Sequence, residues 1–361
     1  MSALRSLPYV AWTEEDVDSS KSGVIKHEAS KAFAGYNIYT NDKDQVIIMD
    51  MKGQHVHSWN LPGKVHCELA ELLDEGQVLV ICEAQSIIKL DWWGEVLWER
   101  TGKMNHDVAV LPDGSSLVSV REWPRLYKFV PWVVFDSIVH HSPEGKELDV
   151  WSSYDQLEEL QKHHQPLELD SPMWKFDIKD MIRAYEYYHL NTVEVLPESP
   201  LGKRDKRFQA GNILLSLRNA NLIVILDKDS WEIEWSWGPG ILDFPHMPTM
   251  IKNGNLLIFD NGPNRTYSRV IELEPISKKI AWEYQASPPT DFHSKWRGSN
   301  QRLPNGNTLI CDSQNGRVFE VTKEGEVVWE FWNPVIKNGK RKLIYRMMRL
   351  PKGKVEPYLQ G

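Results

Sequence analysis

The sequence has little cysteine: Cys67, Cys82 and Cys311 are the only three among 361 residues. An odd number without the spacing of a metal site is typical of a reducing compartment, so we expect no disulfide pair. Cys82 and Cys311 lie in apolar stretches, and we interpret them as small core residues.

Long apolar runs are also missing. No stretch approaches the ~18 apolar residues of a membrane-spanning helix, and residues 1–8 lack the apolar segment of a secretion signal. If this start is native, we expect a cytoplasmic protein without membrane contacts. Basic residues are not in excess either: 42 Lys and Arg are mixed with 50 Asp and Glu, for a net charge of −8. Without a basic stripe, nucleic acid is not an expected partner.

What the chain does have is a repeat that ends in tryptophan. Six times a turn leads into a short apolar strand that closes on Trp59, Trp98, Trp151, Trp235, Trp282 and Trp329. The copies recur at roughly 40 to 50 residues, with longer gaps at inserted loops, and this period with several strands per unit is typical of a β-propeller. Because a small sheet cannot bury both faces alone, we expect these tryptophans to pack between neighbouring sheets as core residues.

The last copy shows the unit most clearly. Asn305-Gly306-Asn307 opens a strand over 308–312, a second strand follows over 317–321, and a turn leads to Val327-Val328-Trp329. The pattern predicts three short strands per repeat. We therefore expect an all-β, six-bladed β-propeller in a single domain spanning 1–361, closed by pairing residues near 36–39 with the C-terminal end.

A long insertion interrupts this pattern over residues 124–188, which we assign to the second blade. The run 154–161 is amphipathic and predicts a short helix of one to three turns. The insertion is either a lid over one mouth of the ring or a plain surface excursion.

Four histidines occupy matching places in consecutive repeats. They lie six or eight residues before the turn that opens the repeat, and these offsets put their side chains on one face of the inner strands. The four are His66, His106, His189 and His246. Such a set at matching offsets indicates a functional cluster near the propeller axis.

Several motifs resemble those of the arylsulfate sulfotransferase family. They are Phe292-His293, the run from Gly298 to Leu309, Phe319-Glu320-Val321-Thr322, Val328-Trp329-Glu330, Asn253-Gly254-Asn255, Phe259-Asp260-Asn261-Gly262 and Ser268-Arg269. The resemblance extends from about Tyr36 to Pro334. It implies a six-bladed propeller that moves a sulfuryl group from an aryl sulfate to a phenol through a sulfated histidine.

The resemblance also implies roles for single residues. His246 matches the nucleophile, and His106, His189 and Arg218 match the other catalytic positions, with Arg218 or a protonated His106 or His189 meeting negative charge on the sulfuryl oxygens. His66, Asn191, His293 and Arg269 are expected to bind substrate. The partners implied are an aromatic sulfate and a phenol, and no cofactor is expected.

Two other functions stay open at this point. The four histidines could instead hold a cation in a metal-dependent hydrolase or lyase, since imidazole suits Zn, Mn, Fe or Cu, although a cationic Arg218 nearby would oppose it. A propeller can also be a binding scaffold without chemistry. The donor, the acceptor and the oligomeric state, for which a homodimer is one alternative, are not given by the sequence.

Overall fold

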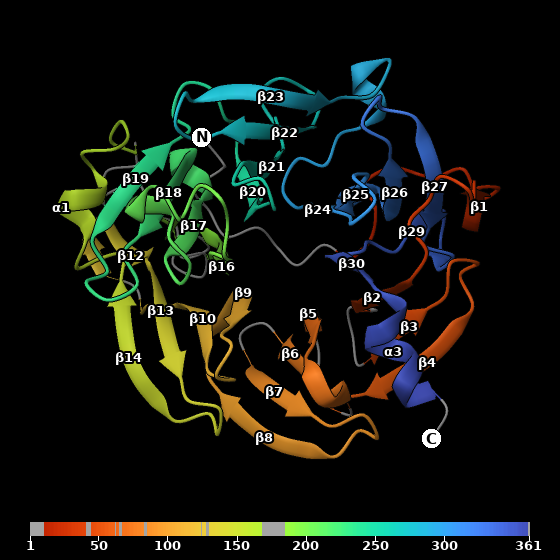
Figure 1. The fold of residues 1–361 in the computed structure, drawn as a ribbon, viewed down its shortest axis with the longest axis horizontal. Helices are drawn as coiled ribbons and strands as arrows, with labels where there is room; N and C mark the ends of the chain where they lie inside the picture. Colours follow the sequence, from red (N-terminus) through yellow and green to blue (C-terminus); the bar gives the residue numbers. More distant parts are fainter. Residues whose placement is uncertain are drawn as a thin grey trace. The chain divides into compact units, whose positions relative to one another are not determined.

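The computed structural model describes residues 11–40, 45–61, 63–64, 67–82, 85–123, 125–127, 130–167 and 185–359. Within these ranges the chain forms six antiparallel blade sheets, five of four strands and one of five. Their strand orders are β30-β2-β3-β4, β5-β6-β7-β8, β14-β13-β10-β9, β16-β17-β18-β19, β20-β21-β22-β23 and β1-β27-β26-β25-β24. The fold class is therefore the predicted six-bladed β-propeller (Figure 1). Each blade has at least four strands instead of the three predicted for each repeat, because an inner strand, such as β9 with His106 or β20 with His246, is an additional member of the sheet.

The chain divides into two compact units, and the first contains residues 103–254. Its strands are β9 (Met104–Val110), β10 (Ser116–Arg121), β11 (Arg125–Tyr127), β12 (Val130–Val134), β13 (Asp136–His141), β14 (Glu147–Ser152), β15 (Tyr185–Glu186), β16 (Leu190–Val195), β17 (Ile213–Leu217), β18 (Leu222–Leu226), β19 (Ile233–Trp237) and β20 (Pro245–Met250). Helix α1 (Leu157–Leu160) is the short helix predicted from the amphipathic run.

The second unit contains residues 10–102 and 255–361. Its strands are β1 (Gly23–His27), β2 (Tyr36–Thr40), β3 (Gln45–Met49), β4 (His55–Asn60), β5 (Cys67–Leu72), β6 (Val78–Cys82), β7 (Ser86–Leu90), β8 (Val96–Thr101), β21 (Leu256–Asp260), β22 (Arg269–Glu274), β23 (Lys279–Tyr284), β24 (Ser299–Arg302), β25 (Thr308–Asp312), β26 (Arg317–Val321), β27 (Val327–Trp332), β28 (Ile336–Lys337), β29 (Lys340–Arg341) and β30 (Met347–Leu350), followed by helix α3 (Lys352–Leu359). The expectation of one domain over the whole chain stays a prediction.

The predicted closure is confirmed within the second unit. β30 pairs antiparallel with β2, with Tyr36 opposite Leu350 and Tyr39 opposite Met347. In Figure 1 the blue β30 lies beside the red-orange β2. β30, the last of the described strands, therefore completes the sheet that contains β2, β3 and β4.

Burial explains which strands are apolar throughout. Middle strands such as β17 (ILLSL) and β18 (LIVIL) are buried along their whole length, because both faces of the sheet are covered. Outer strands such as β8 and β23 are largely exposed. Four of the closing tryptophans are buried as predicted, but Trp98 on β8 and Trp282 on β23 are only partly buried.

The insertion belongs to the third sheet in chain order, not the second. It begins after β10, where β11 and β12 leave the sheet, and resumes after β14 with α1 and β15. β12 and β15 pair in parallel, with Val134 opposite Glu186. Residues 168–184 of the insertion lie outside the described residues, and its predicted role at the mouth of the ring stays untested.

The cysteine prediction was wrong. Cys67 and Cys82 stand opposite each other on β5 and β6 and form a disulfide, while Cys311 is a buried free thiol. Strand register brings these two residues together, and their separation of 15 residues does not reveal it. Among the described residues, no helix is both long and apolar enough to cross a lipid bilayer.

Candidate active site

Three of the four matching histidines lie in the first unit. Each is near or just before the start of the strand that comes first, in chain order, in its sheet. His106 is in β9, His189 comes directly before β16, and His246 is in β20. All three are buried. His66 lies outside the described residues.

The register of two strands brings His189 and Arg218 together. Leu190 of β16 pairs with Leu217 of β17. His189 directly precedes Leu190 and Arg218 directly follows Leu217, so the two lie next to each other. Arg218 begins the 3-10 turn η4 (Arg218–Ala220), and its Nη1 lies 2.9 Å from His189 Nε2. Its backbone N–H also donates to the His189 carbonyl at 3.3 Å.

These contacts define the protonation state of His189. A guanidinium only donates hydrogen bonds, so His189 Nε2 must accept with its lone pair, and the ring proton resides on Nδ1. Nδ1 donates to the Glu186 carboxylate. Burial and the Arg218 charge hold the pKa of His189 well below its usual value, against the opposing effect of Glu186. His189 is therefore a neutral imidazole, so of the two histidines that the sequence suggested as a protonated group only His106 remains a candidate.

Glu186 is the central acceptor of this network. Its Oε2 accepts from His189, and its Oε1 lies 2.7 Å from Arg121 Nη2. Burial alone would raise the pKa of this carboxyl, but its contact with His189 and the Arg121 charge bring it well below the usual value. Glu186 is thus a buried carboxylate between a neutral imidazole and a cation.

The Arg218 side chain is 1% exposed and is fixed on several sides. Its Nε donates to Asn219 Oδ1 at 3.1 Å, and its Cζ lies 5.5 Å from the centre of the Phe244 ring. Asn219 in turn donates to the Glu186 carbonyl at 2.7 Å. The guanidinium is therefore preorganised, with little side-chain freedom left to lose when an anion binds.

His246 is placed by the backbone on either side of it. Asn191 Nδ2 donates to the Pro245 carbonyl at 2.8 Å, and Met247 N–H donates to Thr192 Oγ1 at 2.9 Å. The His246 Nδ1 lies 3.2 Å from the Phe244 carbonyl. Because a carbonyl only accepts, this contact requires the proton on Nδ1 and leaves the lone pair on Nε2.

The backbone is strained at these positions. His189, Phe244 and Met247 have φ values of +53°, +61° and +46°, in the left-handed region that residues with a side chain rarely adopt. Such strain is typical of functional sites, where the surrounding structure imposes it. Here Phe244 and Met247 flank His246, so strained backbone sets the direction of its ring.

His106 joins the network through its ring. The His106 and His189 ring centroids are 4.4 Å apart and their planes are tilted by 36°. Asp136 ties the two histidine segments together: it accepts from Asn105 Nδ2 at 3.1 Å and from the Leu190 backbone N–H at 3.0 Å. Burial raises the pKa of Asp136 to about 7.

The structure therefore brings His106 against His189 and His189 against Arg218, and Asn191 anchors the strand of His246. Sequence reasoning missed Glu186, Arg121 and Asp136. Glu186 lies three residues before His189, and this acidic residue beside a predicted site histidine was a usable signal. Arg121 and Asp136 had no such signal, because they reach the site through the pairing of β10 with β13.

Arg269 has structural partners in the second unit. Its Nε lies 2.8 Å from Asp260 Oδ2, and its Nη1 lies 3.3 Å from Glu283 Oε2, so it links β21, β22 and β23. Its predicted role in substrate binding remains a prediction.

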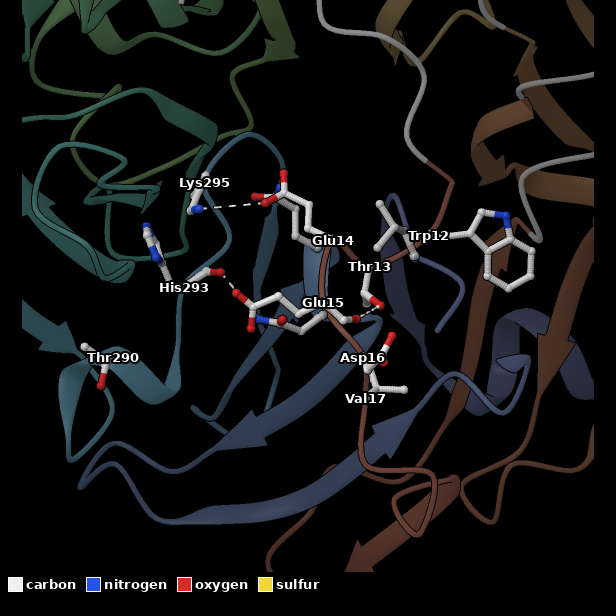
Figure 2. Close-up of a pocket in the computed structure, with 12 residues that line it drawn as sticks. Trp12, Thr13, Glu14, Glu15, Asp16, Val17, Thr290, His293 and Lys295 are labelled. Carbon is white, nitrogen blue, oxygen red and sulfur yellow. Dashed lines mark hydrogen bonds and ion pairs between the residues drawn. The ribbon is translucent and has the colours of Figure 1, made fainter. Parts of the chain in front are cut away.

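His293 lines a cavity of about 270 Å³ in the second unit (Figure 2). The segment 12–17 forms one wall, and Lys295 reaches Glu14 at 3.9 Å across it. His293 thus has a cavity of its own within this unit, and its predicted role in substrate binding remains a prediction.

The metal alternative needs imidazole nitrogens that are available as ligands. Both ring nitrogens of His189 are instead engaged, one with Glu186 and the other with the cationic Arg218. In the parts of the chain that the structure describes, no three His, Cys, Asp or Glu side chains are grouped as metal ligands would be.

Solved structures similar to this chain share its fold at low sequence identity. A protein of unknown function from Bacteroides caccae is 15% identical with a TM-score of 0.58, and the match covers 87% of this chain and 98% of that one. A β-propeller domain of Cps50 (Swd1) from Myceliophteria thermophila is 11% identical with a TM-score of 0.51, covering 92% and 99%. A streptogramin B lyase is 10% identical with a TM-score of 0.50, covering 93% and 87%. These likenesses concern the fold alone.

No curated protein matches this chain. The arylsulfotransferase (ASST) family, in contrast, matches residues 69–334, which contain most of the six sheets and every residue of the histidine network. The chain therefore belongs to the arylsulfotransferase family, a family of transferases.

Proposed function

We propose that this protein transfers a sulfuryl group from an aryl sulfate to a phenol through a sulfated His246. The observation that carries the proposal is the contact between His246 Nδ1 and the Phe244 carbonyl at 3.2 Å, which puts the ring proton on Nδ1 and the nucleophilic lone pair on Nε2. Arg218, whose guanidinium lies over the Phe244 ring, is the nearby fixed cation.

In the first half-reaction the Nε2 lone pair of His246 forms a bond to the sulfur of the donor. The bond between sulfur and the aryl oxygen breaks, and its electron pair leaves with the phenolate, which then takes up a proton. The Nδ1 proton stays in place, so the sulfated ring carries a positive charge that the Phe244 carbonyl stabilises.

In the second half-reaction the acceptor phenol gives up its proton and its oxygen attacks the same sulfur. The nitrogen–sulfur bond breaks and the electron pair returns to His246 Nε2. The net change exchanges a proton and a sulfuryl group between two phenols, so no metal, oxidant or other cofactor is required by the chemistry.

Negative charge develops on the leaving oxygen and the sulfuryl oxygens, much as in phosphoryl transfer. Arg218 offers a planar set of donors for these oxygens, and one such donor is typically worth about 3 kcal/mol at the transition state. Because His189 is neutral and accepts from Arg218, it orients the guanidinium and does not supply a proton. We assign the proton transfer to His106, which packs against His189.

The compartment is a separate question. The cytoplasmic location expected from the sequence remains a prediction, and the Cys67–Cys82 disulfide argues against it because disulfides persist in oxidising compartments.

The direct test is to incubate the purified protein with an activated aryl sulfate in the absence of acceptor. We expect one sulfuryl group per chain by intact mass, located on His246 by peptide mapping, and ping-pong kinetics when a phenol is added. Release of the phenol without any adduct on His246 would contradict the proposal.

A further inference from the structure

We infer that Glu186 is a positioning residue that acts on the reaction through His189 and Arg218. This inference rests on the proposed sulfuryl transfer but concerns a residue that does not itself touch the reacting atoms. The contacts form one line: Arg121 to Glu186, Glu186 to His189 Nδ1, and His189 Nε2 to Arg218 Nη1.

The first step is the placement of Glu186 by the insertion. Glu186 ends β15, which pairs in parallel with β12, and the Tyr187 N–H donates to the Val134 carbonyl at 2.9 Å. Both short strands belong to the insertion over 124–188, outside the four-stranded sheets. A segment added to the propeller thus supplies a carboxylate to the site.

The second step is the effect on His189. A buried Nδ1–H needs an acceptor, and the Glu186 carboxylate is that acceptor. The Glu186 side chain is 5% exposed and the His189 side chain is 8% exposed. This hydrogen bond fixes the ring plane as well as the proton. The Nε2 lone pair therefore points at Arg218 and holds one of its donors.

The third step is the charge. Glu186 is 4% exposed, and Arg121 at 2.7 Å balances it, so the neutral His189 does not have to become protonated to pair the carboxylate. Asp136, Asp107 and His106 are the other buried titratable groups nearby, and the two Asp carboxylates already accept backbone or amide N–H bonds. Arg218 thus keeps its positive charge beside a neutral imidazole, and its orientation is fixed by His189.

The experiment compares Glu186→Gln and Glu186→Asp in the native background and in Arg218→Ala, with the single-turnover rate of His246 sulfation as the measurement. Glu186→Gln keeps the size and loses the charge, and we expect a rate about 10- to 100-fold lower with little change in donor KM. Glu186→Asp keeps the charge and should recover part of that rate. In Arg218→Ala the further loss from Glu186→Gln should be less than about threefold, because the cation that it positions is absent.

The matched control is Glu194→Gln. Glu194 is on β16 in the same unit, and its Oε1 accepts from the Met250 N–H at 2.9 Å. The Glu194→Gln substitution removes a carboxylate that links β16 to β20. The Glu194 carboxylate is not a member of the line from Arg121 to Arg218 that orients His189, so the sulfation rate should stay within about twofold. Circular dichroism and thermal unfolding establish that each variant is folded.

A second readout does not depend on activity. The His189 Nδ1 proton, held by a buried carboxylate, should give a far-downfield proton resonance in NMR, identified by its loss in His189→Gln. Glu186→Gln should remove it or move it upfield. An unchanged resonance, or an equal loss of rate with and without Arg218, would overturn the inference. If even the native protein forms no adduct, the proposed function fails while the resonance still decides the role of Glu186.

Discussion

His189 and Arg218 are 29 residues apart in the chain, yet Nε2 and Nη1 lie 2.9 Å from each other because Leu190 and Leu217 are partners across two antiparallel strands. The pairing also makes the imidazole an acceptor. The sequence suggested His189 as a proton donor, but the strand register makes it the hydrogen-bond acceptor that orients the Arg218 guanidinium.

Replacing His246 by Ala should abolish both sulfuryl transfer and the covalent adduct, because Nε2 is the proposed nucleophile. Intact mass after incubation with an aryl sulfate and a steady-state assay check the two losses separately. A chelator should leave the native activity unchanged, since the chemistry needs no metal. Retention of the adduct in His246→Ala would assign the nucleophile elsewhere.

Arg218→Ala should slow the sulfation of His246 by roughly 100-fold or more, because a buried donor to the transition-state charge is lost. Arg218→Lys should recover only part of the rate. The ammonium group of Lys keeps the charge but lacks the planar set of donors through which Arg218 is held by His189 and Asn219. Stopped-flow measurement of phenol release checks both. Equal rates for the Lys variant and the native protein would show that charge alone suffices.

Asp136 should make the folded protein less stable as pH rises from about 4 to 7. Burial raises its pKa to about 7, so in this range the folded state holds a proton that the unfolded state has released. The contribution is on the order of 2 to 4 kcal/mol. Urea unfolding of the native protein and of Asp136→Asn at pH 5 and pH 8 checks it: the variant, which cannot ionise there, should show the smaller loss of stability at pH 8.

The buried ion pair between Arg349 and Glu320 should be important for stability in the second unit. Both side chains are 0% exposed, their charged atoms are 3.0 Å apart, and Arg349 also donates to the Phe33 carbonyl at 2.6 Å. Arg349→Met should cost about 3 to 5 kcal/mol, because it leaves a buried carboxylate without its partner. Adding Glu320→Gln should restore part of this loss in denaturant unfolding. A more stable single variant would contradict the prediction.

The thiols give a separate test of the disulfide. Burial raises the pKa of the Cys311 thiol to about 12, so the native protein should resist alkylation. Unfolding without a reductant should expose one reactive thiol, and unfolding with a reductant should expose three, as counted by mass spectrometry after alkylation. Three reactive thiols without a reductant would exclude the Cys67–Cys82 bond.

The sequence was sufficient to predict the blades, because buried strands and the turns between them give apolar and turn residues a regular spacing along the chain. Asn253-Gly254 and Asn305-Gly306 mark turns whose glycines have φ values of +89° and +90°, and the strands that follow are buried on both faces. It did not reveal that Trp98 and Trp282 are only partly buried, because all six closing tryptophans hold the same position in the repeat.

The site was less accessible to sequence reasoning. His106, His189, His246 and Arg218 were identified from spacing and resemblance, but the protonation of His189 depends on which atoms face it. Arg121 and Glu186 are 65 residues apart and meet only because β12 and β15 pair within the insertion. Contacts of this kind follow from tertiary structure and leave no local pattern.

The pairing of β2 with β30 has a consequence for biosynthesis. The ribosome makes β2, β3 and β4 early and β30 after all the other described strands, so the edge of β2 that pairs with β30 has no partner during most of translation. An open strand edge invites pairing with other chains. The nascent protein should therefore be most prone to aggregate before residues 347–350 emerge, and stalled or truncated chains should depend most on chaperones.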